Sequence, residues 1–228
     1  DMGIGDMTPS NPDCKIKTPV LQKMADEGIL FMDAHSTSAV CTPTRYGLLT
    51  GRYNWRSVKA RGVLSGTSPH LIPADRPTLA HMLRKAGYAT QMIGKWHLGL
   101  GFQKHSNGEW DWTKPLTYSP VDVGFERSLV IPASLDFPPY VYIEGHKITG
   151  LPDREQPAQK FPAYLRKGEL GSNFSILNCL DVLAEKTAEH IKLSAKNKKP
   201  FFLYFPLTAP HKPVLPHPRF EGKTDLGP

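Results

Sequence analysis

Residues 77–97 read Pro-Thr-Leu-Ala-His-Met-Leu-Arg-Lys-Ala-Gly-Tyr-Ala-Thr-Gln-Met-Ile-Gly-Lys-Trp-His, and they contain the pattern that decides the fold. The spacing of apolar residues predicts a helix over 77–87 that ends at Gly87. A short apolar strand over 89–93 follows at once, and then the polar segment Gly94–His97. A helix that leads directly into a short buried strand is the repeating unit of an α/β sheet.

The same alternation recurs on both sides of this unit. We expect a helix over 18–28 followed by a short strand over 29–31, and a second helix from about Arg45 to Gly51. A long helix is predicted over 175–195, and the run Phe-Phe-Leu-Tyr-Phe over 201–205 is interpreted as a fully buried strand. The fold class predicted is α/β, with a largely parallel central sheet flanked by helices.

The segment from 99 to about 171 lacks this periodicity and is rich in proline, glycine and aromatic residues. We interpret it as an elaboration of the domain on its substrate side, because so many aromatic side chains require burial or a ligand. The whole chain, residues 1–228, is therefore interpreted as part of one domain.

Composition excludes several classes of function. The formal net charge is +7, but no RNA- or DNA-binding motif accompanies it, so nucleic acid is not an expected partner. The lysines at 192, 196, 198 and 199 are interpreted as a solvated helix end. No apolar run reaches the roughly 18–20 residues that span a bilayer, so no membrane partner is expected.

Two polar clusters each follow a predicted strand. Gly94–His97 follows the strand over 89–93, and Thr208-Ala209-Pro210-His211-Lys212-Pro213 follows the strand over 201–205. Ligand sites of open α/β sheets lie beyond the carboxyl ends of the strands. This placement makes His97 and His211 candidates for a site, although a lone histidine is more often structural.

The chain has three cysteines, and one of them stands in a distinctive context. Residues 41–52 read Cys-Thr-Pro-Thr-Arg-Tyr-Gly-Leu-Leu-Thr-Gly-Arg. A cysteine before a helix is usually a small buried side chain. If Cys41 has a chemical role, then Cys14 and Cys179 remain, and the sequence leaves open whether they are bridged or free.

Cysteine, any residue, proline, any residue and arginine, followed by Leu-Thr-Gly-Arg, resembles the modification site of the type I, formylglycine-dependent sulfatases of the alkaline phosphatase superfamily. Gly94–Gly99 and Thr208–Pro213 resemble two further motifs of that family. The opening residues 1–6 resemble its Asp-Asp-x-Gly-x-Gly-Asp motif without the first aspartate. The resemblance implies the N-terminal portion of a sulfatase catalytic domain, truncated at both ends, since the family's remaining metal and sulfate ligands find no match after His211.

The resemblance also implies roles for individual residues. Cys41 would be oxidised to formylglycine, whose hydrate attacks sulfur and then expels sulfate by re-forming the aldehyde. Asp1 and the modified residue 41 would bind Ca²⁺, with Mg²⁺ possible, because hard cations favour carboxylate oxygens. Arg45 would hold the hydrate, and His97 would serve as the base that releases sulfate. Lys95, His211 and, by a looser local match, Ser134 would bind sulfate, with His211 also placed to protonate the leaving alcohol.

The leading hypothesis is a sulfuric ester hydrolase that acts on a sulfated small molecule or polysaccharide. One alternative is a phosphonate or phosphodiester hydrolase of the same superfamily, and another is a non-catalytic binder of sulfated glycans. The resemblance further implies a formylglycine-generating or anaerobic maturation enzyme as a partner. It implies a periplasmic or secreted location, or a lysosomal or extracellular one in an animal, with no signal peptide within this sequence.

Overall fold

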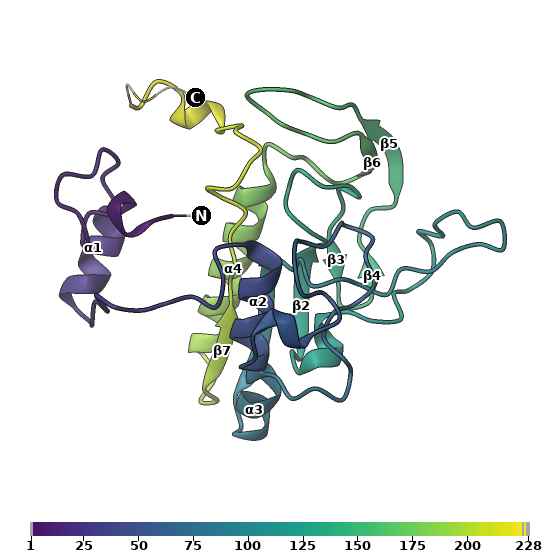
Figure 1. Cartoon of the computed structure of the whole chain (residues 1–228), viewed down its shortest axis with the longest axis horizontal. Helices are drawn as coiled ribbons and strands as arrows, with labels where there is room; N and C mark the ends of the chain where they lie inside the picture. Colours follow the sequence, from purple (N-terminus) through teal and green to yellow (C-terminus); the bar gives the residue numbers. More distant parts are fainter. Residues whose placement is uncertain (1, 225, 227–228) are drawn as a thin grey trace.

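A computed structural model describes residues 2–224 and 226 and centres on a five-stranded sheet in the order β4-β3-β2-β1-β7 (Figure 1). The strands of this sheet are β1 (Ala89–Lys95), β2 (Arg127–Ile131), β3 (Ile143–Glu144), β4 (Lys147–Ile148) and β7 (Phe201–Tyr204). Strand β1 pairs in parallel with both β2 and β7, whereas β3 and β4 are antiparallel additions at one edge. The core of the sheet is thus parallel, as the sequence predicts.

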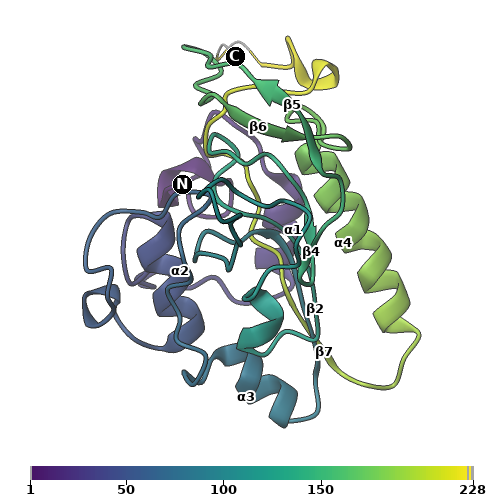
Figure 2. The ribbon, with the colours of Figure 1, turned by 90° about the vertical axis from the view of Figure 1, so that its right-hand side faces the viewer.

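Helices α2 (Cys41–Thr50), α3 (Leu79–Lys85) and α4 (Cys179–Ala195) cover the two faces of this sheet, whereas α1 (Pro19–Asp26) lies apart from the strands (Figure 1). Short 3-10 turns lie at Ile4–Asp6, Asn54–Arg56, Pro120–Val123 and Pro218–Phe220. Figure 2 shows α2 and α3 on one side of the strands and the long α4 on the other. The predicted fold class, an α/β sheet flanked by helices, is confirmed.

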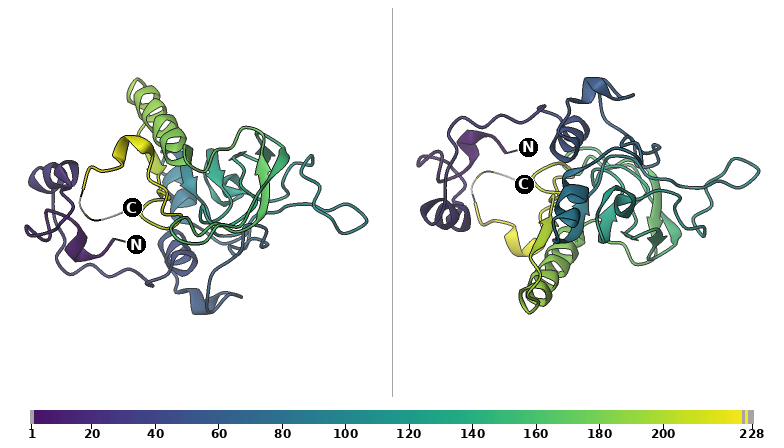
Figure 3. Two further views of the ribbon diagram at one scale, coloured as in Figure 1. Left: turned by 90° about the horizontal axis from the view of Figure 1, so that it is seen from above. Right: turned by 90° about the horizontal axis from the view of Figure 1, so that it is seen from below.

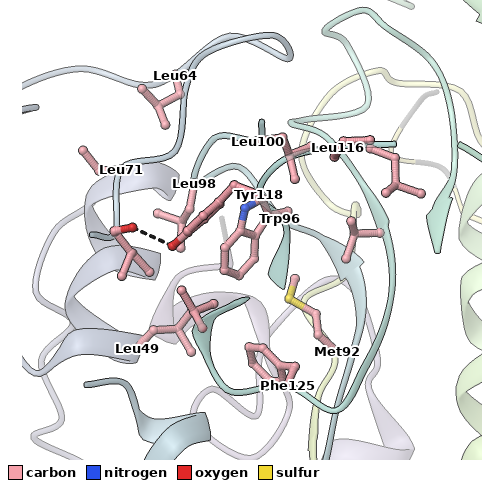
Figure 4. Close-up of a cluster of buried hydrophobic side chains, with 14 of the residues drawn as sticks. Leu49, Leu64, Leu71, Met92, Trp96, Leu98, Leu100, Leu116, Tyr118 and Phe125 are labelled. Carbon is pink, nitrogen blue, oxygen red and sulfur yellow. Dashed lines mark hydrogen bonds between the residues drawn. The ribbon is translucent and has the colours of Figure 1, made fainter. Parts of the chain in front are cut away.

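Alternation along the parallel strands divides the core into two layers, because successive side chains of a strand point to opposite faces. Met92 of β1 and Val130 of β2 join the layer beneath α2 and α3, together with Trp96 and Tyr118. Figure 4 shows this cluster around the Trp96 indole. The next residues, Ile93 and Ile131, join the layer beneath α4. The end of β1, where Lys95 lies, is therefore held by packed side chains on both faces of the sheet.

Some local expectations were wrong. Residues 29–31 form no strand; Ile29 and Phe31 are 79% and 73% exposed on an extended connection between α1 and α2. The apolar run has no partner strand among residues 2–224 and 226, and an isolated strand gains no ladder hydrogen bonds. Strand β7 is half-buried rather than fully buried, because it lies at an edge of the described sheet.

The segment 99–171 is more regular than its sequence indicates. It contributes β2 to the central sheet and carries a separate two-stranded sheet, β5 (Pro152–Gln156) and β6 (Gly168–Gly171). A loop closed by the bridge Lys104–Trp110 projects away from the body, on the side opposite α1 (Figure 3). No helix within the described part of the chain is long and apolar enough to cross a membrane.

Candidate active site

Cys41 is the first residue of α2 and lines an open pocket of about 550 Å³. Segments that are distant in sequence form the walls: the start of α2 with residues 36–40 that precede it, the end of β1, the end of β7 with the loop that follows it, and residues 2–3. Of the residues that the sequence singles out, the pocket is lined by Cys41, Arg45, Lys95 and His211. The positive end of the helix dipole at this start favours an anion nearby.

Arg45 lies one turn after Cys41 on α2 and reaches across to the sheet. Its Nη1 donates a hydrogen bond of 2.6 Å to the backbone carbonyl of Lys95. Burial lowers the pKa of the guanidinium from its usual value, and the neighbouring Tyr204 hydroxyl and Cys41 sulfur offset part of that effect. An arginine nevertheless stays charged at any physiological pH. Arg45 thus brings a permanent cation to the pocket and ties α2 to β1.

Lys95 ends β1 and is only 2% exposed. Burial, followed by the nearby charge of Arg45, lowers the pKa of its amine to about 8. Gly94 permits this placement: its φ is +132°, and a Cβ there would lie 2.3 Å from the carbonyl oxygen of Pro206. The close approach lets the Lys95 N–H donate a 3.0 Å hydrogen bond to that same oxygen, which joins β1 to the end of β7.

Neither the half-buried Arg45 nor the buried Lys95 is paired with a carboxylate among the described residues. Among residues 2–224 and 226, the ion pairs nearest the pocket join Asp136 to Arg166, Lys212 and His211, and none involves Lys95 or Arg45. Burying a charge without a counter-ion is costly, so an arrangement of this kind is typical of a site that receives an anion.

His97 lies behind the pocket rather than in its lining. Its backbone has φ 59°, a left-handed conformation that is strained for a residue other than glycine. Nε2 donates to the carbonyl of Leu64 at 2.8 Å, which leaves Nδ1 as the acceptor, 3.4 Å from Oγ of Ser134. Burial, with the charge of Lys95, lowers the pKa of His97 to about 3, so the ring is neutral. The structure therefore brings His97 and Ser134 together, one layer beneath the pocket.

His211 follows β7 and lines the pocket opposite Cys41's helix. Its Nδ1 donates to the carbonyl of Lys212 at 2.8 Å and lies 3.8 Å from Oδ1 of Asp136. The pKa of the imidazole is lowered overall, chiefly by burial. The hydrogen bond to the Lys212 carbonyl and the charge of Asp136 raise this pKa, whereas the charges of Lys95 and Lys212 lower it. With Nδ1 occupied, Nε2 is the nitrogen left for a ligand.

The remaining site expectations concern metal and disulfide chemistry. Asp1 lies outside the described residues, although its neighbours Met2 and Gly3 line the pocket. Within 2–224 and 226, no group of three or more His, Cys, Asp or Glu side chains is arranged to hold a metal ion. The described residues therefore do not by themselves form a calcium site. Cys14 and Cys179 are both free and buried, so they are not bridged to each other.

Sequence reasoning missed several residues of the site. Thr42, inside the cysteine motif, donates from Oγ1 to the carbonyl of His97 at 2.9 Å and accepts from the Leu64 N–H at 3.3 Å. Tyr204 contributes its hydroxyl beside Arg45 and lines the pocket. The position of Tyr204 at the end of a strand next to β1 was the available signal, since such ends form the ligand edge of the sheet.

The fold and the pocket together define an α/β protein with a pocket lined by cationic side chains at the carboxyl edge of its parallel strands. The sulfatase family model matches residues 1–227, and the chain belongs to the sulfatase family.

Curated relatives and solved structures agree with this assignment. The chain is 35% identical to an N-acetylgalactosamine-6-O-sulfatase of Bacteroides thetaiotaomicron, over 100% of this chain and 50% of the relative. It is 31% identical to the human N-acetylgalactosamine-6-sulfatase, over 100% of this chain and 41% of that protein. A solved structure described with glycosaminoglycan metabolism by Bacteroides thetaiotaomicron superposes with a TM-score of 0.82 at 32% identity, covering 98% of this chain and 52% of the other. The chain thus spans about half the length of these relatives.

Proposed function

We propose that the protein to which this chain belongs hydrolyses a sulfate ester of a carbohydrate. One observation carries this proposal: Cys41 opens α2 in a pocket that also holds the half-buried Arg45 and the buried Lys95, with no carboxylate paired to either among the described residues. Sulfate esters are anionic, so their hydrolysis requires cations at the reacting group and a strongly activated nucleophile.

The nucleophile of the proposal is residue 41 after oxidation to formylglycine. The aldehyde hydrate supplies one hydroxyl for attack at sulfur and a second for release of sulfate. Support comes from the family membership and from the cysteine motif, which begins at the pocket-lining end of α2. The maturation enzyme that would perform this oxidation is part of the same proposal.

The side chains of this pocket have separate tasks in the proposed reaction. Arg45 and Lys95 neutralise the charge of the sulfate group and orient it above residue 41. His211 directs Nε2 into the pocket and donates a proton to the departing alcohol. Ser134 and Thr42 hold His97 behind the pocket, and His97 remains the base proposed for release of sulfate, through Nδ1, because Nε2 donates to Leu64.

The substrate class is proposed from the relatives. Two of them are named sulfatases of N-acetylgalactosamine-6-sulfate, and their identities to this chain are 35% and 31%. We therefore propose a 6-O-sulfated amino sugar within a glycan as the first substrate to test. A calcium requirement and a periplasmic, secreted or lysosomal location rest on the family resemblance, and no step above depends on them.

The proposal is tested by parallel assays of the full-length protein, matured with its native machinery. N-acetylgalactosamine-6-sulfate is compared with a phosphate diester and a phosphonate ester of matched leaving group. We expect turnover of the sulfate ester, lost in Cys41→Ala. Preference for the phosphorus esters would establish the alternative hydrolase, and binding without turnover of any ester would establish the glycan-binding alternative.

A further inference from the structure

Asp136 is a buried carboxylate behind the pocket that the reaction described above does not use. It follows β2 in the loop Ile131–Asp136 and is 0% exposed. Three cationic or protonatable groups surround it: Arg166 forms a short hydrogen-bonded ion pair with Oδ2, Nζ of Lys212 lies 3.7 Å from Oδ2, and Nδ1 of His211 lies 3.8 Å from Oδ1.

The two carboxylate oxygens differ in their partners. Oδ2 interacts with Arg166 and Lys212, whereas Oδ1 is buried and has no hydrogen-bond partner. A buried carboxylate oxygen without a hydrogen-bond partner is costly, and Nδ1 of His211, whose hydrogen is donated to the Lys212 carbonyl, lies 3.8 Å from it. Oδ1 therefore acts on the imidazole through its charge and not through a hydrogen bond.

We infer that Asp136 is a positioning residue that stabilises the protonated form of His211, whose tautomer the Lys212 carbonyl holds, so that His211 Nε2 acts as the acid toward the leaving alcohol. This inference rests on the proposed function and names the group that supports its proton donor. In the step concerned, the Nε2 proton passes to the bridging oxygen as the S–O bond breaks, and the imidazole is left neutral until solvent protonates it again.

The other charged groups around His211 also act on the protonation of its imidazole. Lys95 from β1 and Lys212 from the same loop disfavour the imidazolium, while Asp136 and the Lys212 carbonyl favour it. Asp136 is thus the only carboxylate among residues 2–224 and 226 that forms an ion pair with this ring. Arg166 weakens the effect of Asp136 on His211, because the positive charge of its guanidinium offsets part of the negative charge of the carboxylate.

A leaving-group comparison separates this role from a structural one. A sugar alcohol leaves poorly and needs the proton, whereas 4-nitrophenolate leaves without it. We expect Asp136→Asn to lower kcat/KM on the sugar sulfate about 10-fold or more relative to 4-nitrophenyl sulfate, in the range for losing a residue that orients a catalytic side chain. In a His211→Ala background, Asp136→Asn is expected to change that ratio by less than about twofold, because residues that act as one unit are not additive.

The pH profile supplies a second readout. Since His211 must be protonated, activity on the sugar sulfate falls as pH rises through its pKa. Removing the Asp136 charge lowers that pKa, so the alkaline limb of Asp136→Asn moves to lower pH. Arg166→Gln moves it to higher pH, because the full charge of Asp136 then faces the ring.

A readout without turnover keeps this inference separate from the proposed function. The pKa of His211, measured by NMR on the full-length protein with His211→Ala for assignment, falls in Asp136→Asn and rises in Arg166→Gln. Equal losses on both sulfate esters, or a His211 pKa unchanged in both variants, overturns the role of Asp136. A wild-type protein inactive on every sulfate ester but with the expected pKa changes overturns the proposed function and not this pairing.

Discussion

Nη1 of Arg45 donates a 2.6 Å hydrogen bond to the backbone carbonyl of Lys95, and this bond joins the helix that carries Cys41 to the strand that carries the buried amine. Cys41 and Arg45 are four residues apart on α2 and so share a helix face. A single guanidinium therefore ties the proposed nucleophile's helix to the strand that ends at Lys95, one of the two cations proposed to bind the substrate.

Arg45→Lys tests this geometry while keeping the charge. A lysine has no planar fork and cannot serve the Lys95 carbonyl and the pocket at once. We expect kcat/KM on a sulfate ester to fall about 10- to 100-fold, since a hydrogen bond from a charged group contributes about 1.5–3 kcal/mol. The control is Arg56→Lys, at an exposed position, with wild-type kinetics expected. Unchanged kinetics in Arg45→Lys would show that charge alone suffices.

Thr42→Val tests the support beneath the pocket. The hydroxyl of Thr42 bridges the His97 carbonyl and the Leu64 N–H, and both lose a partner when it is removed. We expect the free energy of unfolding to fall by about 1–3 kcal/mol, the cost of unsatisfied buried polar groups. Thr42→Ser keeps the hydroxyl and serves as the control in urea unfolding. A valine variant as stable as the serine variant would refute the bridge.

Gly94→Ala tests the approach of β1 to the end of β7. The new Cβ would lie 2.3 Å from the Pro206 carbonyl oxygen at a φ of +132°. Backbone strain and overpacking together predict a loss of about 2–5 kcal/mol. Gly108→Ala is the matched control, because its φ is also positive but nothing lies within 4 Å of its Cβ. Equal unfolding free energies for the two variants would contradict this packing.

His97 is expected to stay neutral throughout the working pH range. Its pKa is lowered to about 3 by burial and by the charge of Lys95, so the ring gains a proton only under strongly acidic conditions. Its imidazole signals in an NMR titration should therefore show no midpoint between pH 4.5 and 8. A midpoint near pH 6 would mean that the ring is exposed to solvent in the native protein.

The sequence predicted the parallel core because the periodicity of apolar residues indicates its helices and strands. The position of the site followed, because ligands of such sheets bind beyond the carboxyl ends of the strands. The helix-to-strand unit over 77–97 and the apolar run at 201–205 form adjacent parallel strands, as β1 and β7. The clusters that follow them then necessarily meet at one edge of the sheet. This is why the sequence alone indicates that Lys95 and His211, 116 positions apart, belong to one site.

Features that depend on tertiary partners could not be predicted in the same way. The apolar residues 29–31 match a strand pattern, but no described strand pairs with them. Asp136 lies next to a polar turn in sequence, and only the return of the chain at Arg166 makes it a buried ion-pair centre. The tautomer of His97 likewise depends on a carbonyl 33 residues away, at Leu64.

Peptide mass spectrometry across residue 41, on full-length protein matured with its native machinery and active on a sulfate ester, tests the central claim most directly. The account predicts a peptide lighter by about 18 Da than the cysteine form, the difference between CH₂SH and the aldehyde that serves as nucleophile. An unmodified thiol at Cys41 in protein that still hydrolyses the ester would contradict it.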